Sequence, residues 1–141
     1  MIVRRGGEAD VAALAELRDI AAERVGAFGD WMIAHAGTHL PFVAEVAGRV
    51  VGAAWLHVAS RVPGGAAFER GYGDVQSVMV RQEWRNRGVG AALMAAILDE
   101  ARERGLQHVT VHSGRRAVDF YARNGFAHHR QLLLWEPGVT P

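Results

Sequence analysis

Two β-rich runs that flank Gly48 and Arg49 constrain the fold more than any other feature of this sequence. Residues 41–60 read PFVAEVAGRVVGAAWLHVAS, and both runs are rich in valine. Such runs on either side of a short glycine-containing turn are typical of a β-hairpin. The helical patterns that precede residue 41 therefore lead into an antiparallel sheet.

Strand and helix patterns alternate along the rest of the chain. Apolar residues at spacings of three from Val11 to Ile20 predict a helix over residues 8–26. Residues 61–73, rich in glycine and proline, are expected to form a loop. The other expected elements are strands at 1–6, 74–80 and 107–112, helices at 30–37, 88–104 and 115–124, and one closing strand or a tight pair of strands within 127–137. The expected order is therefore β-α-α-β-β-β-α-β-α-β(-β).

Two glycines mark the ends of the last two expected helices. Gly105 and Gly125 follow the helical patterns directly, and Leu106 and Phe126 come next. A Schellman motif needs glycine at the first position after the helix and favours an apolar residue at the second. Both helices are therefore expected to end in this motif.

Length and composition exclude several classes of protein. The 141 residues are half apolar and 22% charged, which predicts one globular domain over residues 1–141. The chain has no cysteine, so disulfides, thiolate nucleophiles and cysteine-based zinc sites are excluded. It also has no lysine, and all 16 basic residues are arginine, so a Schiff base and a P-loop lysine are excluded as well.

The charge and the apolar runs set expectations for partners and location. The net charge of +1 gives no strong general attraction to nucleic acid or to a membrane surface. No apolar run follows the charged N-terminal residues, and the longest run, at 50–59, is too short to cross a bilayer. We therefore expect a soluble cytoplasmic protein that binds neither nucleic acid nor membrane.

The stretch WRNRGVGAAL, which ends at Leu93, lies between an expected strand and an expected helix. The first turn of a helix has unpaired N–H groups and the positive end of the helix dipole, so an anion can bind there. Gly88 and Gly90 would let a phosphate approach the backbone, and Arg85 and Arg87 would add charge. The stretch is no P-loop, which needs lysine, and no dinucleotide fingerprint, because Leu93 replaces the third glycine. A plain helix start with flexible glycines is the alternative.

A second pattern, AVDFYARNGF, places Tyr121 on an amphipathic helix. Ala117, Tyr121 and Asn124 share one face of that helix because they are four and seven positions apart. The plain interpretation of Tyr121 is a core aromatic residue. The functional interpretation is a phenol that donates a proton in a reaction.

Together, the two patterns resemble motifs of the GNAT family, the Gcn5-related N-acetyltransferases. They are R-x-x-G-x-G from Arg85 to Gly90 and A-x-x-x-Y-x-x-x-G-F from Ala117 to Phe126, and the order of elements is similar over nearly the whole chain. The resemblance implies an α/β (α+β) fold whose mixed, mostly antiparallel twisted sheet is flanked by helices. It also implies an N-acetyltransferase that moves an acetyl group from acetyl-CoA directly to a primary amine, in a ternary complex and without a metal.

The resemblance further implies roles for individual residues. Tyr121 would protonate the departing CoA thiolate. A backbone N–H at Val78 or Val80 would polarise the acetyl carbonyl, with the pantetheine arm paired along this strand and the fourth and fifth strands splayed apart. The expected cofactor-binding residues are Val78, Met79, Val80, Arg85, Asn86, Arg87, Gly88, Val89, Gly90 and Ala91.

The general base and the acceptor stay open. The acceptor could be a small-molecule amine or a protein amine, and a homodimer is compatible with the sequence. The side chains of Phe28, Trp31 and Met32 would help to shape the acceptor site, although they could equally be core or dimer surface. The candidates for the base are Glu69, Asp74, Gln76, Glu83, His112 and a water relay.

Some features depart from the family pattern or permit another function. Gly114 stands where many members carry asparagine, which puts a contact to the cofactor arm in doubt, and Gln82 replaces a proline. His35 and His39 have the spacing of a metal pair, but Gly37 lies between them and argues against zinc. The alternatives are a non-catalytic acyl-CoA-binding sensor and a nucleic-acid-binding domain that uses the arginines at 81–87.

Overall fold

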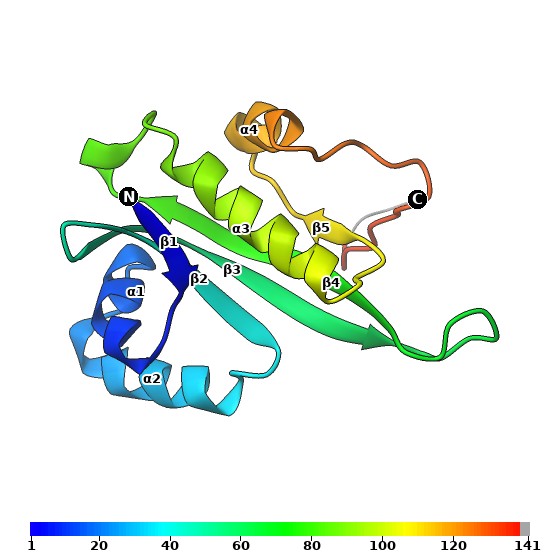
Figure 1. Ribbon diagram of the computed structural model, residues 1–141, viewed down its shortest axis with the longest axis horizontal. Coiled ribbons are helices and arrows are strands. Elements are labelled where there is room, and N and C mark those ends of the chain that lie inside the picture. The colour runs from blue at the N-terminus through cyan, green and yellow to red at the C-terminus, as the bar shows by residue number, and fades with distance from the viewer. Residues whose placement is uncertain (139–141) are drawn as a thin grey trace.

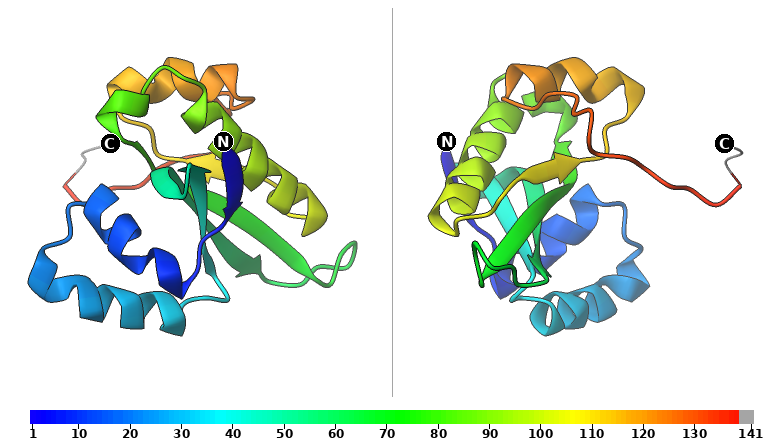
Figure 2. Two further views of the ribbon diagram at one scale, coloured as in Figure 1. Left: turned by 60° about the vertical axis from the view of Figure 1, so that its left-hand side comes forward. Right: turned by 90° about the vertical axis from the view of Figure 1, so that its right-hand side faces the viewer.

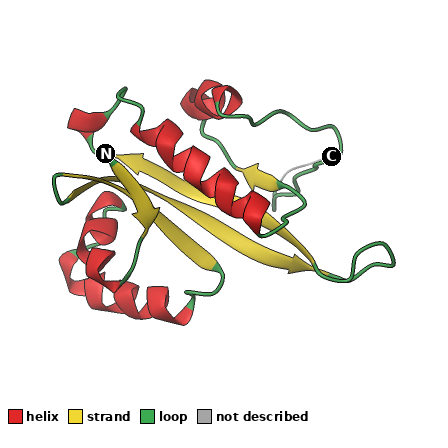
Figure 3. Ribbon diagram, viewed as in Figure 1, coloured by secondary structure: helices red, strands yellow, loops and turns green. Residues whose placement is uncertain are grey.

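A five-stranded sheet in the order β1-β2-β3-β4-β5 forms the centre of the structure, a computed structural model that describes residues 1–138 (Figures 1 and 3). The first four strands run antiparallel to their neighbours, while β4 and β5 are parallel. This is the expected mixed, mostly antiparallel sheet. The strands are β1 (Ile2–Arg5), β2 (His39–Val46), β3 (Arg49–Arg61), β4 (Arg70–Val80) and β5 (Val109–Val111).

The expected hairpin is formed by β2 and β3. Its turn is centred on Ala47 and Gly48, with φ of 50° and 77°, rather than on Gly48 and Arg49. Positive φ at both central positions is what a two-residue hairpin turn requires. A second hairpin joins β3 to β4, and the pairing of Arg61 with Arg70 shortens the expected loop 61–73 to residues 62–69.

The first helical region differs from the prediction of one helix over residues 8–26. Helix α1 (Val11–Leu17) ends early, and α2 (Val25–Ala34) begins before the expected start at residue 30. Asp19 adopts a φ of 56°, and the N–H of Ile20 then donates to the carbonyl of Ala15 at 3.0 Å, which closes α1. Aspartate tolerates the left-handed region better than most residues, so a helix can end without glycine or proline.

The last two helices end as predicted. They are α3 (Val89–Glu103) and α4 (Val118–Arg123), which is preceded by a short 3₁₀ turn. Gly105 and Gly125 have φ of 67° and 97°, and the N–H of the apolar residue after each glycine donates back across the last helical turn at 3.0 Å. Both Schellman motifs are therefore confirmed.

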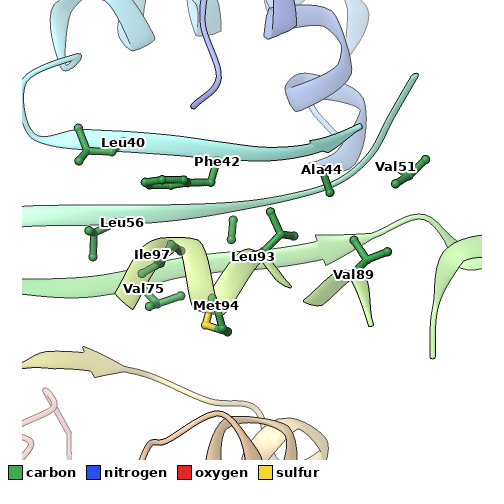
Figure 4. Packing of buried hydrophobic residues seen from close by; sticks show 11 residues of the cluster. Leu40, Phe42, Ala44, Val51, Leu56, Val75, Val89, Leu93, Met94 and Ile97 are labelled. Atoms are coloured by element: carbon green, nitrogen blue, oxygen red, sulfur yellow. The ribbon is translucent and has the colours of Figure 1, made fainter. Parts of the chain in front are cut away.

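The two helix pairs cover opposite faces of the sheet (Figure 2). Because side chains alternate along a strand, the sheet contributes to two cores. The core under α3 is shown in Figure 4, and Leu93, Met94 and Ile97 of that helix are fully buried in it. The core under α1 and α2 is smaller and consists of Leu14, Leu17, Met32, Val43, Val50, Ala53 and Trp55.

The predicted closing strand within 127–137 is absent from the described residues. After α4 the chain forms turns and irregular structure and extends away from the sheet (Figure 2). β5 is only three residues long, shorter than the expected strand 107–112, so it offers few backbone groups to another strand. The side chains from Leu132 to Trp135 are exposed. Separately, no helix within residues 1–138 is long and apolar enough to cross a membrane.

The core under α3 is expected to supply much of the stability of the fold. Replacing the fully buried Leu93 with alanine should lower the free energy of unfolding by about 2–5 kcal/mol, because it removes buried methyl groups and leaves a cavity. The matched control is Leu133→Ala, since Leu133 is 91% exposed, and a change within about 0.5 kcal/mol is expected. Urea unfolding of both variants measures the difference, and equal losses would contradict the assignment of the core.

Candidate functional site

A cavity of about 510 Å³ lies beside the part of β4 that β5 does not cover. β5 pairs with β4 only from Gly73 to Val75, so residues 76–80 have no strand beside this edge within the described chain. A β-bulge, in which two residues of β4 lie opposite Trp55 of β3, introduces the uncovered stretch. The backbone groups of this edge are therefore accessible to a ligand.

Three segments line this cavity: the end of β4, the turn that leads into α3 with the first turn of that helix, and α4. Nine of the ten predicted cofactor-binding residues are among them, and so is Tyr121; Arg87 alone of the predicted set is not. The lining residues are Val78, Met79, Val80, Trp84, Arg85, Asn86, Gly88, Val89, Gly90, Ala91, Ala117, Phe120, Tyr121, Arg123 and Asn124. Two sequence patterns that lie about 30 residues apart thus meet at one cavity.

The turn before α3 presents backbone N–H groups. Gly88 caps the helix with a φ of 82°, and Asn86 has a φ of 60°, so both residues lie in the left-handed region. No side chain caps the helix, and the N–H groups of residues 88–91 have no hydrogen-bond partner within residues 1–138. These groups and the helix dipole together form a suitable site for an anion.

The two glycines of this turn are needed for different reasons. A Cβ atom at Gly90 would lie 2.9 Å from Cε1 of Phe120, so glycine lets the residues before and within α4 pack against the start of α3. A Cβ atom at Gly88 would meet open space, so glycine is needed at this position only because of the positive φ. The sequence did not indicate the packing role of Gly90.

The arginines near the turn are held in different ways. Nε of Arg85 donates to the carbonyl of Val80 at 3.3 Å, which keeps this guanidinium beside the end of β4. The guanidinium of Arg87 lies over the Trp84 ring, 4.9 Å from its centroid. Both arginines are exposed. Their positive charges therefore lie on the solvent side of the turn, near its N–H groups.

Arg81 has a structural role. Its side chain forms an ion pair with Glu16 of α1 at 2.8 Å, and its Nε donates to the carbonyl of Val50 at 2.8 Å. This arginine therefore ties β4 to α1 and β3. Arg81, Arg85 and Arg87 could have formed an RNA-binding patch. Because Arg81 is paired with Glu16, only two of these three arginines remain for such a patch.

The Tyr121 side chain is partly buried and lines the cavity. Its ring packs edge-on against Phe120 and Phe126, with centroids 5.0 Å and 5.6 Å away, so the core-aromatic interpretation is correct in part. Burial raises the pKa of the Tyr121 phenol above its ordinary value. The phenol is protonated at neutral pH, as in an ordinary tyrosine, and can therefore act as a proton donor.

The candidates for the general base lie outside this cavity. Glu69 is exposed in the loop before β4, and His112 is exposed after β5. Glu83 forms an ion pair with Arg49 at 3.3 Å on the surface. None of these three side chains is among the residues that line the cavity.

Asp74 and Gln76 lie on the other face of β4. They alternate with Val75, which belongs to the core under α3, so their side chains point toward the α1 and α2 side. Asp74 accepts a hydrogen bond from the hydroxyl of Thr110 at 2.7 Å. Gln76 lines a second cavity, and its amide has no basic lone pair with which to accept a proton.

This second cavity, called the aromatic cavity below, has a volume of about 340 Å³. The predicted acceptor residues Phe28 and Trp31 line it, whereas Met32 lies in the adjacent core. Sequence reasoning did not place four other lining residues at the acceptor site, namely Arg18, Ile20, His39 and Trp55. The inward alternation of β3 could have indicated Trp55, but the place of Arg18 depends on the early end of α1.

Three histidines gather beside the aromatic cavity. The rings of His39 and His57 stack with centroids 4.4 Å apart, and the His35 ring stacks on Trp31 at 4.2 Å. Burial, together with the neighbouring histidines, lowers the pKa of His39. Within residues 1–138, no three potential ligand side chains are arranged to hold a metal ion.

Comparison with known proteins identifies relatives of this chain. Residues 10–126 match the model of the Acetyltransferase (GNAT) family. The chain is 32% identical over 94 residues to glucosamine 6-phosphate N-acetyltransferase of Trypanosoma brucei brucei, an alignment that covers 66% of this chain and 62% of the relative. It is 34% identical over 100 residues to mycothiol acetyltransferase of Cellulomonas flavigena, covering 67% of this chain but 28% of the relative. The chain thus spans less than two thirds of either relative.

The fold is also found among solved structures. A predicted acetyltransferase of Clostridium acetobutylicum, solved with acetyl-CoA, superposes with a TM-score of 0.77 over 96% of this chain and 95% of that protein. The two sequences are 13% identical, so this likeness concerns the fold. The family match covers most of the chain, both curated relatives are acetyltransferases, and the fold agrees. This chain belongs to the Acetyltransferase (GNAT) family.

Proposed function

We propose that this protein transfers an acetyl group from acetyl-CoA directly to a primary amine. One observation carries the proposal: unpaired N–H groups at the start of α3, the uncovered edge of β4 and the Tyr121 side chain all border one cavity of about 510 Å³. A cofactor with a pyrophosphate at one end and a thioester at the other needs these features in this order. The match to the GNAT family supports acetyl-CoA as this cofactor.

The start of α3 would hold the pyrophosphate. Its N–H groups at residues 88–91 can each donate to a phosphate oxygen, and the helix dipole favours the negative charge. Arg85 and Arg87 add charge at the solvent side. The pantetheine arm would then run along residues 76–80 of β4 and pair with backbone groups that β5 leaves uncovered.

The reaction would take place at the point where this arm ends. The amine nitrogen bonds to the acetyl carbon while a backbone N–H at Val78 or Val80 stabilises the charge that develops on the carbonyl oxygen. The carbon–sulfur bond then breaks, and the thiolate takes the proton of the Tyr121 phenol. The position of the Tyr121 phenol supports the role, because it borders the same cavity as Val78 and Val80 and keeps its proton at the pH at which the amine reacts.

We propose that water takes the proton of the attacking amine. None of the predicted side-chain bases lines the cavity at β4, and the carboxylate of Asp74 is occupied by Thr110. The cavity is open to solvent, so water can reach the amine from the uncovered side of β4. A single essential base is therefore not required.

The anion site at Gly88 can be tested with a matched pair of variants. Gly88→Glu should weaken acetyl-CoA binding at least about tenfold, because the carboxylate would stand beside the phosphates. Gly105→Glu is the control, since Gly105 also has a positive φ and open space around it but lies at the far end of α3. Calorimetric titration with acetyl-CoA compares the two variants. Equal affinity in both would refute the site.

The role of Tyr121 can be tested against the other tyrosine of the chain. Tyr121→Phe should keep acetyl-CoA affinity but lower kcat about tenfold or more, because the thiolate loses its proton donor. Tyr72→Phe is the control, because Tyr72 stacks on His108 and does not line the cavity. An unchanged kcat in Tyr121→Phe would leave Tyr121 with a packing role alone.

A further inference from the structure

The aromatic cavity opens beside the same stretch of β4 as the cofactor cavity, but from the other face of the sheet. Gln76 lines the aromatic cavity and Val78 lines the cofactor cavity. Residues two apart on a strand are separated by about 7 Å and normally face the same side, but the β-bulge at residues 76 and 77 lets Gln76 and Val78 line cavities on opposite faces. An acceptor in the aromatic cavity can therefore reach the acetyl group across this edge of β4.

Three aromatic side chains form the walls of the aromatic cavity. The ring of Trp55 packs edge-on against Phe28 and Trp31, with centroids 6.2 Å and 6.4 Å away. Trp55 is 6% exposed, whereas Trp31 is 41% exposed. Trp31 thus keeps an exposed apolar surface beside the buried ring of Trp55. These surfaces suit an apolar or aromatic group of the acceptor.

The charge at this cavity is positive. Arg18 lines it, and its Nη1 lies 3.5 Å from the carbonyl oxygen of Gln76, too far for more than a weak hydrogen bond. Within residues 1–138 this guanidinium has no carboxylate partner, in contrast to Arg81 nearby, which is paired with Glu16. Among the described residues, no aspartate or glutamate lines the cavity. The site therefore favours an acceptor with an anionic group over one with several positive charges.

The position of Arg18 also fixes where the anionic group lies on the acceptor. The guanidinium is beside the β4 edge at Gln76, close to the place where the amine must attack. The amine and the anionic group must therefore be neighbours in the acceptor, while the apolar part extends toward Trp31 and Phe28. An amine and a carboxylate on the same carbon atom satisfy this arrangement.

We propose that the acceptor is an α-amino acid with an apolar or aromatic side chain, whose carboxylate binds Arg18 and whose side chain enters the aromatic cavity. This inference rests on the function proposed above. The amine forms an amide bond with the acetyl carbon, the carbon–sulfur bond breaks, and Tyr121 protonates the sulfur. The ammonium nitrogen loses two protons: water takes the first before the attack, and the second restores the Tyr121 phenol after it has protonated the sulfur, so the products are an N-acetyl amino acid and CoA thiol.

Release of CoA thiol, measured with a panel of amines, tests the acceptor class. L-phenylalanine and L-leucine should show a kcat/KM at least about tenfold above that of 2-phenylethylamine, which has the aromatic ring but no carboxylate. Glucosamine 6-phosphate and a polycationic aminoglycoside complete the panel. A preference for either of these, or equal rates with 2-phenylethylamine, would overturn the proposal.

Two arginine variants test the carboxylate contact. Arg18→Gln should raise KM for L-phenylalanine about ten- to hundredfold and leave turnover of 2-phenylethylamine unchanged. Arg24→Gln is the control, because Arg24 is exposed on the same part of the fold but does not line the cavity. An equal response of L-phenylalanine turnover to both substitutions would contradict the role of Arg18.

The same assays separate a failure of this inference from a failure of the proposed function. If acetyl-CoA binds and amines of another class react, the acetyl transfer stands and the acceptor class is wrong. If acetyl-CoA does not bind to the wild-type protein, both proposals fail. Titration of the protein with acetyl-CoA alone distinguishes these two results.

Discussion

The parting of β4 and β5 after Val75 is the constraint on which the rest of the site depends. A parallel pair that continued would satisfy the backbone groups of residues 76–80 and fill the space between the strands. Instead, the β-bulge opposite Trp55 redirects β4, and β5 ends after Val111. The uncovered edge then lies between two cavities on opposite faces of the sheet. A cofactor approaching from the α3 side and an acceptor approaching from the α1 side can meet there.

The start of α3 serves both the fold and the site. Val89 is buried in the core under this helix, while the residues of the same helical turn also line the cavity. Gly88 supplies the positive φ that turns the chain into the helix, and Gly90 leaves room for the ring of Phe120. That contact places the next residue, Tyr121, at the cavity. Packing and the proposed anion binding thus impose separate requirements on a few neighbouring residues.

Features set by local sequence could be predicted, and features set by distant contacts could not. The hairpin of β2 and β3, the helix from Val89 and both Schellman motifs depend on glycines and apolar spacing that are visible in the sequence. The break of the first helix depends on an aspartate with positive φ, a residue that carries no strong stop signal. The prediction of a closing strand was wrong, because the β propensity of Leu132–Trp135 does not by itself provide a neighbouring strand with which to pair. The aromatic cavity combines side chains from several elements, so only part of it was named.

The central claim is that the cavity at the start of α3 binds acetyl-CoA, and thermal unfolding of the wild-type protein tests it most directly. Acetyl-CoA at about 100 times its Kd stabilises a protein by about 2.7 kcal/mol, which raises Tm by about 5–10 °C for a domain of this size. NADH and ATP serve as controls for general binding of nucleotides. We expect the increase with acetyl-CoA and not with the controls. An unchanged Tm with acetyl-CoA, or an equal increase with ATP, would contradict the claim.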